Sequence, residues 1–381
     1  MIVFFAIFSD AIFINHFLAS LLETKHMDIV TISIILSVKR FAKIIFDIPI
    51  GLLASKIGLK KVLILSRLLK LASVCLLFCS GKFCLITSMI LYGMAHVAFY
   101  GKFEVYMYNY LADTKNISVI FRKITGFCYG AQDFLAFVVS LIGFRIFTIT
   151  NSYNILIALS IIILLTFIMV AIYMPNTDNI NLLTHKKLVF KKINATIIKH
   201  ILFLSILIAL AFSITDIFQI GLVNIKESPA NIAIISGMSS LAMFFGCILP
   251  LFSSKYINKT KQITQVLLLI LLATSLSILI FGINLYTSLF LIPYFLIFPT
   301  MEILFEFKLD VLSKIELRAL VSSLSTTCST ILGGVFGAFV ASLSSYISFS
   351  AAFSMLLAII CSTLLFLHRN IALSKNSISQ N

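Results

Sequence analysis

Charged residues are scarce in this sequence. They make up 11% of its 381 residues, whereas hydrophobic residues make up 60%, and the mean hydropathy is +1.11. A soluble chain of this length needs many more polar groups to cover its exterior, so the composition excludes a soluble globular protein. The solvent around most of the chain must be lipid, and each helix that crosses a bilayer needs about 20 mostly apolar residues.

Several other features are missing. The apolar runs, such as "ILIALSIIILLTFIMVAIYM", have no period of two, which excludes a membrane β-barrel. No glycine-rich loop ends in Lys-Ser or Lys-Thr, so ATP is not expected as the energy source. The seven cysteines lie in or beside apolar segments without zinc-type spacing to histidines, so we expect them to be small core residues. We expect no enzyme, cofactor or metal site.

The apolar runs predict an all-α membrane protein with twelve transmembrane helices. A polar, basic stretch separates six spans from six, and most other connections are short, as in bundles of antiparallel helices. We therefore expect an N-terminal six-helix bundle at 1–174, a cytoplasmic linker at 175–199, a C-terminal six-helix bundle at 200–368 and a cytoplasmic tail at 369–381. The spans are 2–22, 29–50, 61–80, 83–110, 121–147, 151–173, 200–223, 229–252, 263–283, 286–306, 319–345 and 347–367.

Basic residues are distributed unevenly over this topology. Nineteen of the 29 lysines and arginines lie in loops on one predicted side, and only Lys25, Lys82, Arg145 and Lys226 lie in loops on the other. An excess of Lys and Arg marks cytoplasmic loops, so both termini are predicted to be cytoplasmic and the protein to lie in the inner (plasma) membrane. The net charge of +15 follows from topology, and no nucleic-acid partner is expected.

The two halves contain a weak repeat. A shift of 199 residues lays "GLLASKIGLKK" (51–61) on "PLFSSKYINKT" (250–260) with four identities, and both segments follow the second span of their half. This recurrence at equivalent positions predicts two parallel six-helix repeats. Such repeats are typical of transporters whose halves are related by an axis along the membrane normal.

The loop after the second span resembles the signature loop of the major facilitator superfamily. That pattern runs Gly, three residues, Asp, a basic residue, one residue, Gly, one residue and two basic residues. The resemblance covers the chain through its span count, halves and central linker. It implies the major facilitator fold, alternating access, a monomer and a gating role for this loop. The positions concerned are Gly51, Lys56, Gly58, Lys60 and Lys61, with Ser55 at the acidic position.

Two positions and one missing residue depart from the family pattern. Ser55 can cap a helix but lacks the charge of the usual Asp. Ala131 stands where drug antiporters of the family carry Pro, and the fourth span lacks the Arg that often accompanies proton-coupled antiport. Drug export is thus not supported. Two alternatives stay open: a non-transporting protein, sensor-like or degraded, on the same scaffold, and a different twelve-span flippase or exporter.

Ionisable residues at membrane depth are candidates for the solute and ion pathway, because each is costly there unless it faces a cavity or a partner. In the second span, Lys39, Lys43 and Asp47 share one helix face, with Arg40 beside them. His96 and Glu104 have the same spacing in the fourth span. The candidates are Asp10, Lys39, Arg40, Lys43, His96, Glu104, Asp133, Asp216 and Glu302.

We hypothesise that Lys39, Arg40 and Lys43 bind an anionic or zwitterionic solute. Glu104 or Asp216 would accept a coupling proton, since a carboxyl group in a cavity can load and release one. Structural roles are the alternative. Lys43, Asp47 and Glu104 would then form a salt-bridge cluster between helices, and His96 would be a hydrogen-bonded packing residue. The sequence thus predicts a permease for a small solute, secondary active or facilitative, with symport or antiport of protons as the candidate coupling.

Overall fold

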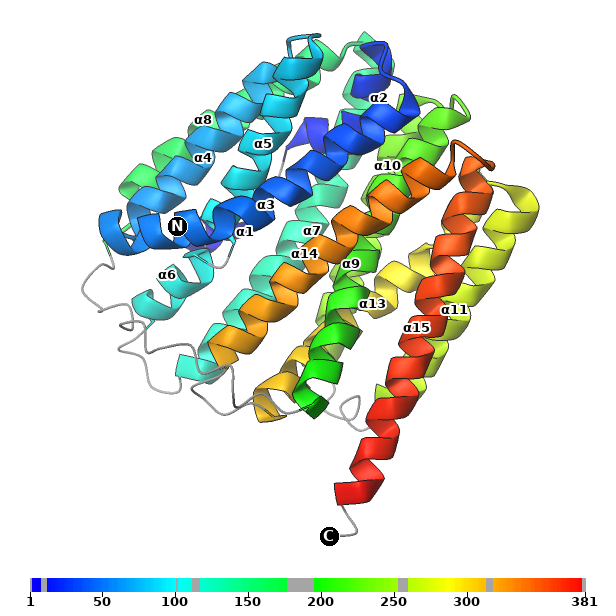
Figure 1. The fold of residues 1–381 in the computed structure, drawn as a ribbon. Coiled ribbons are helices and arrows are strands. Elements are labelled where there is room, and N and C mark those ends of the chain that lie inside the picture. The colour runs from blue at the N-terminus through cyan, green and yellow to red at the C-terminus, as the bar shows by residue number, and fades with distance from the viewer. Residues whose placement is uncertain are drawn as a thin grey trace. The chain divides into compact units, whose positions relative to one another are not determined.

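The computed structural model describes residues 2–7, 12–100, 102–111, 117–176, 195–252, 260–312 and 318–378. Every regular element in these ranges is a helix and none is a strand (Figure 1). Helices satisfy all of their backbone hydrogen bonds internally, which is what long apolar segments in lipid require. The predicted all-α class is therefore confirmed for the described part of the chain.

The chain divides into two compact units. The first comprises Met1–Lys186 and Glu227–Phe244, and the second comprises Lys187–Lys226 and Phe245–Asn381. The helices of the first unit are α1 (Ile2–Ile7), η1 (Phe13–Phe17), α2 (Leu18–Thr24), α3 (Ile29–Ile57), α4 (Leu59–Leu76), α5 (Lys82–Phe99), α6 (Lys102–Tyr110), α7 (Ile117–Thr150), α8 (Tyr153–Tyr173) and the beginning of α10 (Pro229–Phe252). Those of the second are α9 (Ala195–Asn224), the rest of α10, α11 (Thr260–Phe281), α12 (Leu285–Leu289), α13 (Ile292–Leu312), α14 (Arg318–Leu343) and α15 (Phe349–Ile378).

Nine helical segments of the described residues are long and apolar enough to cross a membrane. The chain is thus a multi-pass membrane protein. The helices α3 and α4 are long enough as well, but they carry too many charges to count as simple apolar spans: Lys39, Arg40, Lys43 and Asp47 in α3, and Lys60, Lys61, Arg67 and Lys70 in α4. The predicted first span, 2–22, is described as the separate pieces α1, η1 and α2. The count of twelve spans stays a prediction.

In the first unit, α5 packs against both α3 and α4 (Figure 1). The approach to α3 is close because residue 93 is glycine. A Cβ atom there would lie 2.5 Å from the Lys39 carbonyl oxygen and 2.7 Å from the Ala42 Cβ, closer than real atoms approach. Between α4 and α5, the Ser88 hydroxyl donates to the Ser73 carbonyl at 2.8 Å. Small residues and short hydroxyl side chains are what hold helices together in lipid.

The second unit uses the same kind of contact. The Ser205 hydroxyl of α9 donates to the Ser325 carbonyl of α14 at 3.0 Å, and Ser213 donates to the Gly333 carbonyl at 3.2 Å. Between α11 and α15, which lie side by side in Figure 1, the hydroxyl of Ser354 donates to the Ser275 carbonyl at 2.7 Å. These buried hydroxyls find acceptors across helix pairs, so the unit is held by polar contacts as well as by packing.

The cysteine prediction was partly wrong. Cys128, Cys247 and Cys361 are buried, as expected of small core residues, but Cys75 and Cys79 are exposed. Both lie near the end of α4, where the helix gives way to the turn that leads to α5. Burial follows the position along a helix rather than the apolar character of the flanking sequence.

Candidate functional site

The predicted gate loop is a single residue long. The helix α3 continues seven residues beyond its predicted end, to Ile57, and α4 begins at Leu59, so only Gly58 connects them. Gly58 has φ 90° and ψ 152°, a conformation in which essentially only glycine is found. Lys56 and Lys61 are exposed and Lys60 is half-buried. The side chain of Ser55 lies outside the described residues.

We expect Gly58→Ala to destabilise the protein by about 1–3 kcal/mol, because an alanine is strained at this φ and ψ. The matched control is Gly51→Ala. Gly51 lies within α3, and a Cβ atom there meets nothing within 4 Å, so this change should be neutral or slightly stabilising. Thermal unfolding of the two purified variants in detergent measures the difference. Equal melting temperatures would show that the turn does not depend on glycine.

A cluster of two lysines around one tyrosine lies in the first unit, and we call it the Tyr92 cluster. The Lys70 ammonium of α4 is 3.3 Å from the centre of the Tyr92 ring, and the Lys39 ammonium of α3 is 5.4 Å from it. The Tyr92 hydroxyl donates to the Asn15 side-chain oxygen at 3.2 Å. Desolvated ammonium groups are attracted to the face of an aromatic ring. Three helices thus bring two positive charges to one ring.

A buried arginine, Arg67, lies one helical turn before Lys70 in α4 and also contacts aromatic rings. The Arg67 guanidinium carbon lies 4.2 Å from the Phe99 ring centre and 5.5 Å from the Phe5 ring centre. Arg67 and Lys70 are each only 3% exposed, and their spacing of three puts them on one face of α4. On α3, Arg40 is buried and Lys43 half-buried. Arg40, Arg67 and Lys70 are therefore buried in the interior of this unit.

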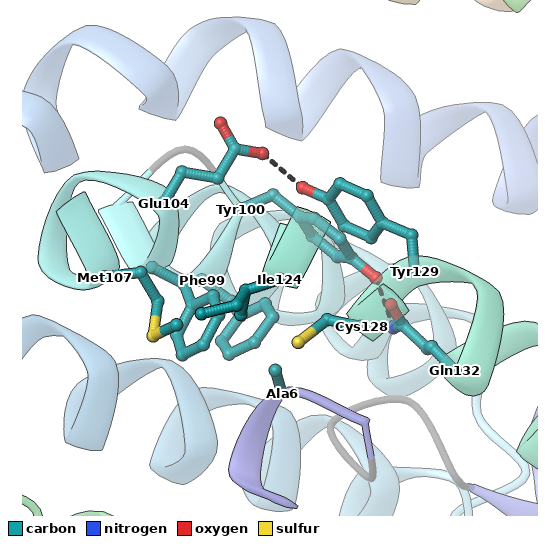
Figure 2. A pocket seen from close by; sticks show the side chains of 10 residues that line it. Ala6, Phe99, Tyr100, Glu104, Met107, Ile124, Cys128, Tyr129 and Gln132 are labelled. Carbon is teal, nitrogen blue, oxygen red and sulfur yellow. Dashed lines mark hydrogen bonds between the residues drawn. The ribbon is translucent and has the colours of Figure 1, made fainter. Parts of the chain in front are cut away.

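A small cavity lies between α5, α6 and α7, and we call it the Tyr129 cavity. Its volume is about 20 Å³, which is room for a single water molecule. Figure 2 shows the polar residues Glu104, Tyr129 and Gln132 around it, with Phe99 and Met107 as part of an apolar wall. A solute does not fit a space of this size, whereas a water molecule or a proton does.

Polar contacts run along this cavity. The Tyr129 hydroxyl donates to the Glu104 carboxylate, and the Gln132 amide donates to the Tyr100 hydroxyl at 2.6 Å (Figure 2). The rings of His96 and Tyr100 stack with their centres 4.2 Å apart. Tyr100 itself has extended backbone angles and ends α5, so the predicted fourth span is interrupted beside the cavity. Of the predicted residues, Glu104 thus lines the cavity, and His96 stacks on Tyr100 beside it.

Asp47 forms a structural contact. Its carboxylate accepts a hydrogen bond from the Lys102 ammonium at 2.8 Å, which joins α3 to α6. Glu104, the other acid of the salt-bridge alternative, is bonded to Tyr129 instead. The structural interpretation thus suits Asp47, while Glu104 belongs to the cavity.

The other predicted site residues are scattered. Asp133 of α7 is half-buried in the first unit, while Asp216 of α9 and Glu302 of α13 are half-buried in the second. Asp10, Ser254, Lys255 and Lys259 lie outside the described residues, so the predicted echo of the gate loop is not described. That these residues together form one solute and ion pathway therefore stays a prediction.

Two cations of the interior, Arg67 and Lys70, were not among the predicted site residues, nor were Tyr92 and Tyr129. One sequence signal was present: a pair of basic residues at positions i and i+3 within the apolar segment "VLILSRLLKLASV". The aromatic partners come from other helices, and spacing along α4 does not reveal them.

No family model and no curated protein matches this sequence. Solved structures do match it over nearly the whole chain. A mutant of the nucleoside transporter NupG matches with a TM-score of 0.71 and 14% identity, covering 97% of this chain and 96% of that one. A D-xylose-proton symporter matches with a TM-score of 0.75 and 11% identity, covering 96% of this chain and 94% of that one. A POT family transporter in complex with 5-aminolevulinic acid matches with a TM-score of 0.75 and 14% identity, covering 97% of this chain and 96% of that one.

At 11–14% identity these likenesses establish the fold. The chain has the fold of major facilitator transporters, and the resemblance drawn from residues 51–61 is confirmed at that level.

Proposed function

We propose that this protein is a membrane transporter that moves a small solute by alternating access between two six-helix bundles, 1–174 and 200–368. The neighbouring structures support this proposal, because all three are named as transporters. One is a nucleoside transporter, one is a D-xylose-proton symporter, and one is a POT family transporter in complex with 5-aminolevulinic acid. In this reading the protein works as a monomer, both termini are cytoplasmic, and the segment from Gly51 to Lys61 is a gating element.

The solute would be an anion or a zwitterion. The observation that supports this class is the Tyr92 cluster together with the buried Arg40: three cations of α3 and α4 in the interior of one unit. Positive charges in the interior of a membrane protein are characteristic of substrate and ion pathways. Carboxylates and phosphates are the groups that such cations bind most strongly. The amino acid 5-aminolevulinic acid, the ligand of one neighbour, has such a carboxylate.

A proton is the proposed coupling ion, and Glu104 is the proposed carrier. Its carboxylate accepts a hydrogen bond from Tyr129 beside a cavity of about 20 Å³, which admits water but no larger molecule. A carboxyl group in contact with a single water can exchange a proton without admitting solute. Asp216 in the second unit is the other proposed carrier.

The test of this function is flux in proteoliposomes. Purified protein is supplied with a carboxylate-bearing amino acid, a phosphorylated sugar, a neutral sugar and a nucleoside, each with and without an inward proton gradient. We expect uptake of one of the two charged classes, and we expect the gradient to increase its accumulation. Uptake of the neutral compounds alone would overturn the proposed solute class, and the absence of any flux would overturn transport.

A further inference from the structure

Three cysteines lie within ten residues of one another where α4 gives way to α5. Cys75 is in the last turn of α4, Cys79 is in the turn, and Cys84 is in the first turn of α5. Cys75 and Cys79 are exposed. The thiol of Cys84 hydrogen-bonds to that of Cys79, and the Cys84 sulfur lies 4.0 Å from the position of a Cβ atom on Gly81. Two thiols five residues apart are therefore in contact across a tight turn.

A lysine from another element completes this group. The Lys25 ammonium, in the turn after α2, donates to the Cys79 carbonyl oxygen at 2.5 Å. Burial lowers the pKa of Lys25, and electrostatic interaction with Cys79 and Cys84 opposes that change. The positive charge of Lys25 therefore lies close to both cysteines. The form of a cysteine that reacts with disulfides is the thiolate.

The predicted topology gives these thiols an oxidising environment. The turn between α4 and α5 lies on the side with only four basic residues, two of which are Lys25 and Lys82, and this is the side opposite the cytoplasm. Disulfides form and persist in extracytoplasmic compartments. The contact between the two thiols, the exposure of Cys79 and the predicted compartment all favour a disulfide.

We propose that Cys79 and Cys84 form a disulfide that closes the turn between α4 and α5. The oxidant is the disulfide of a thiol-oxidase protein of that compartment. One cysteine thiolate attacks that disulfide and releases one thiolate of the oxidase, which gives a mixed disulfide. The second cysteine thiolate then attacks the mixed disulfide, forms the Cys79–Cys84 bond and releases the other oxidase thiolate. The two thiols lose two protons and two electrons, and the oxidase takes up both electrons.

The bond can be identified by peptide mapping of the full chain from membranes of a bacterium with an oxidising periplasm, alkylated before lysis. Trypsin cleaves after Lys70, Lys82 and Lys102, so Cys79 and Cys84 fall on different peptides, 71–82 and 83–102. We expect the two peptides to be joined, and to separate on reduction. We also expect maleimide to label five of the seven cysteines of the denatured chain before reduction and all seven afterwards.

The peptide 71–82 also contains Cys75, so Cys75→Ser is the matched control. The joined peptides should persist in Cys75→Ser and disappear in Cys79→Ser and Cys84→Ser. Labelling of all seven cysteines without reduction would overturn the proposal, and so would joined peptides that persist in Cys79→Ser. The measurement on the unsubstituted chain decides even where a variant fails to reach the membrane.

Discussion

The double substitution Lys39→Gln/Arg40→Gln should abolish uptake of the charged solute while leaving the amount of protein in the membrane unchanged. Lys39 lies 5.4 Å from the Tyr92 ring centre, and Arg40 is 7% exposed. Glutamine keeps much of the side-chain length and the hydrogen-bonding capacity, so the substitution removes mainly charge. Loss of a buried charged partner costs about 2 kcal/mol or more, which corresponds to a loss of solute affinity of about 30-fold or more.

Initial uptake rates in proteoliposomes, measured over a range of solute concentrations, check this expectation. The matched control is Arg145→Gln, because Arg145 is an exposed cation of α7, and it should transport normally. Tyr92→Phe is a second control: it keeps the ring that faces Lys39 and Lys70 but loses the hydrogen bond to Asn15. Normal transport by the double variant would contradict the proposed anion site.

The substitution Glu104→Gln should uncouple solute movement from protons. Glutamine has nearly the shape of a protonated glutamic acid, and its side-chain oxygen still accepts a hydrogen bond from the Tyr129 hydroxyl. A carrier fixed in this neutral form cannot release a proton. We therefore expect accumulation driven by a pH gradient to be lost, whereas exchange of solute across the membrane at equal pH continues.

Paired assays of gradient-driven accumulation and solute exchange separate this outcome from simple inactivation. Tyr129→Phe keeps the carboxyl group and removes the hydroxyl that donates to it, so coupling should survive in that variant. Asp216→Asn tests the other proposed carrier. If coupling were retained in Glu104→Gln and lost in Asp216→Asn, the proton would have to bind in the second unit.

The sequence was sufficient to predict the class of fold, because an all-α membrane protein follows from local composition. The long apolar runs become helices wherever they are described, and the loop around Gly58 suggested the fold of the solved neighbours. Helix ends were less accurate. The segment 51–57 has a lysine and a glycine typical of a loop, yet it continues α3, because the turn needs only one residue in the conformation of Gly58.

The break at Tyr100 could not be predicted for a different reason. The run from 83 to 110 is mostly apolar and has no proline, so it predicts one helix. The interruption is accompanied by contacts of Tyr100 with His96 and with Gln132 of α7, and contacts between helices are not encoded in the periodicity of either one.

The candidate site was predicted in part. Charges at membrane depth identified Lys39, Arg40 and Glu104, because the cost of burying charge is a property of each residue alone. The ring that groups Lys39 with Lys70 depends on how three helices cross, and Arg67 gains its significance from Phe99 and Phe5. Residues that act through partners on other elements are the ones that single-sequence reasoning misses.

The one-residue connection at Gly58 also fixes the rotational phase of α4 about its axis. Each residue of an α-helix advances by about 100° around the axis. One inserted residue that continued the helical path would turn the face that carries Arg67 and Lys70 by about that angle, away from Phe99 and Tyr92. The length of this turn is therefore as strictly constrained as any side chain in the cluster. Insertions here should be far less tolerated than substitutions of Lys56 or Lys61, whose exposed side chains leave the phase unchanged.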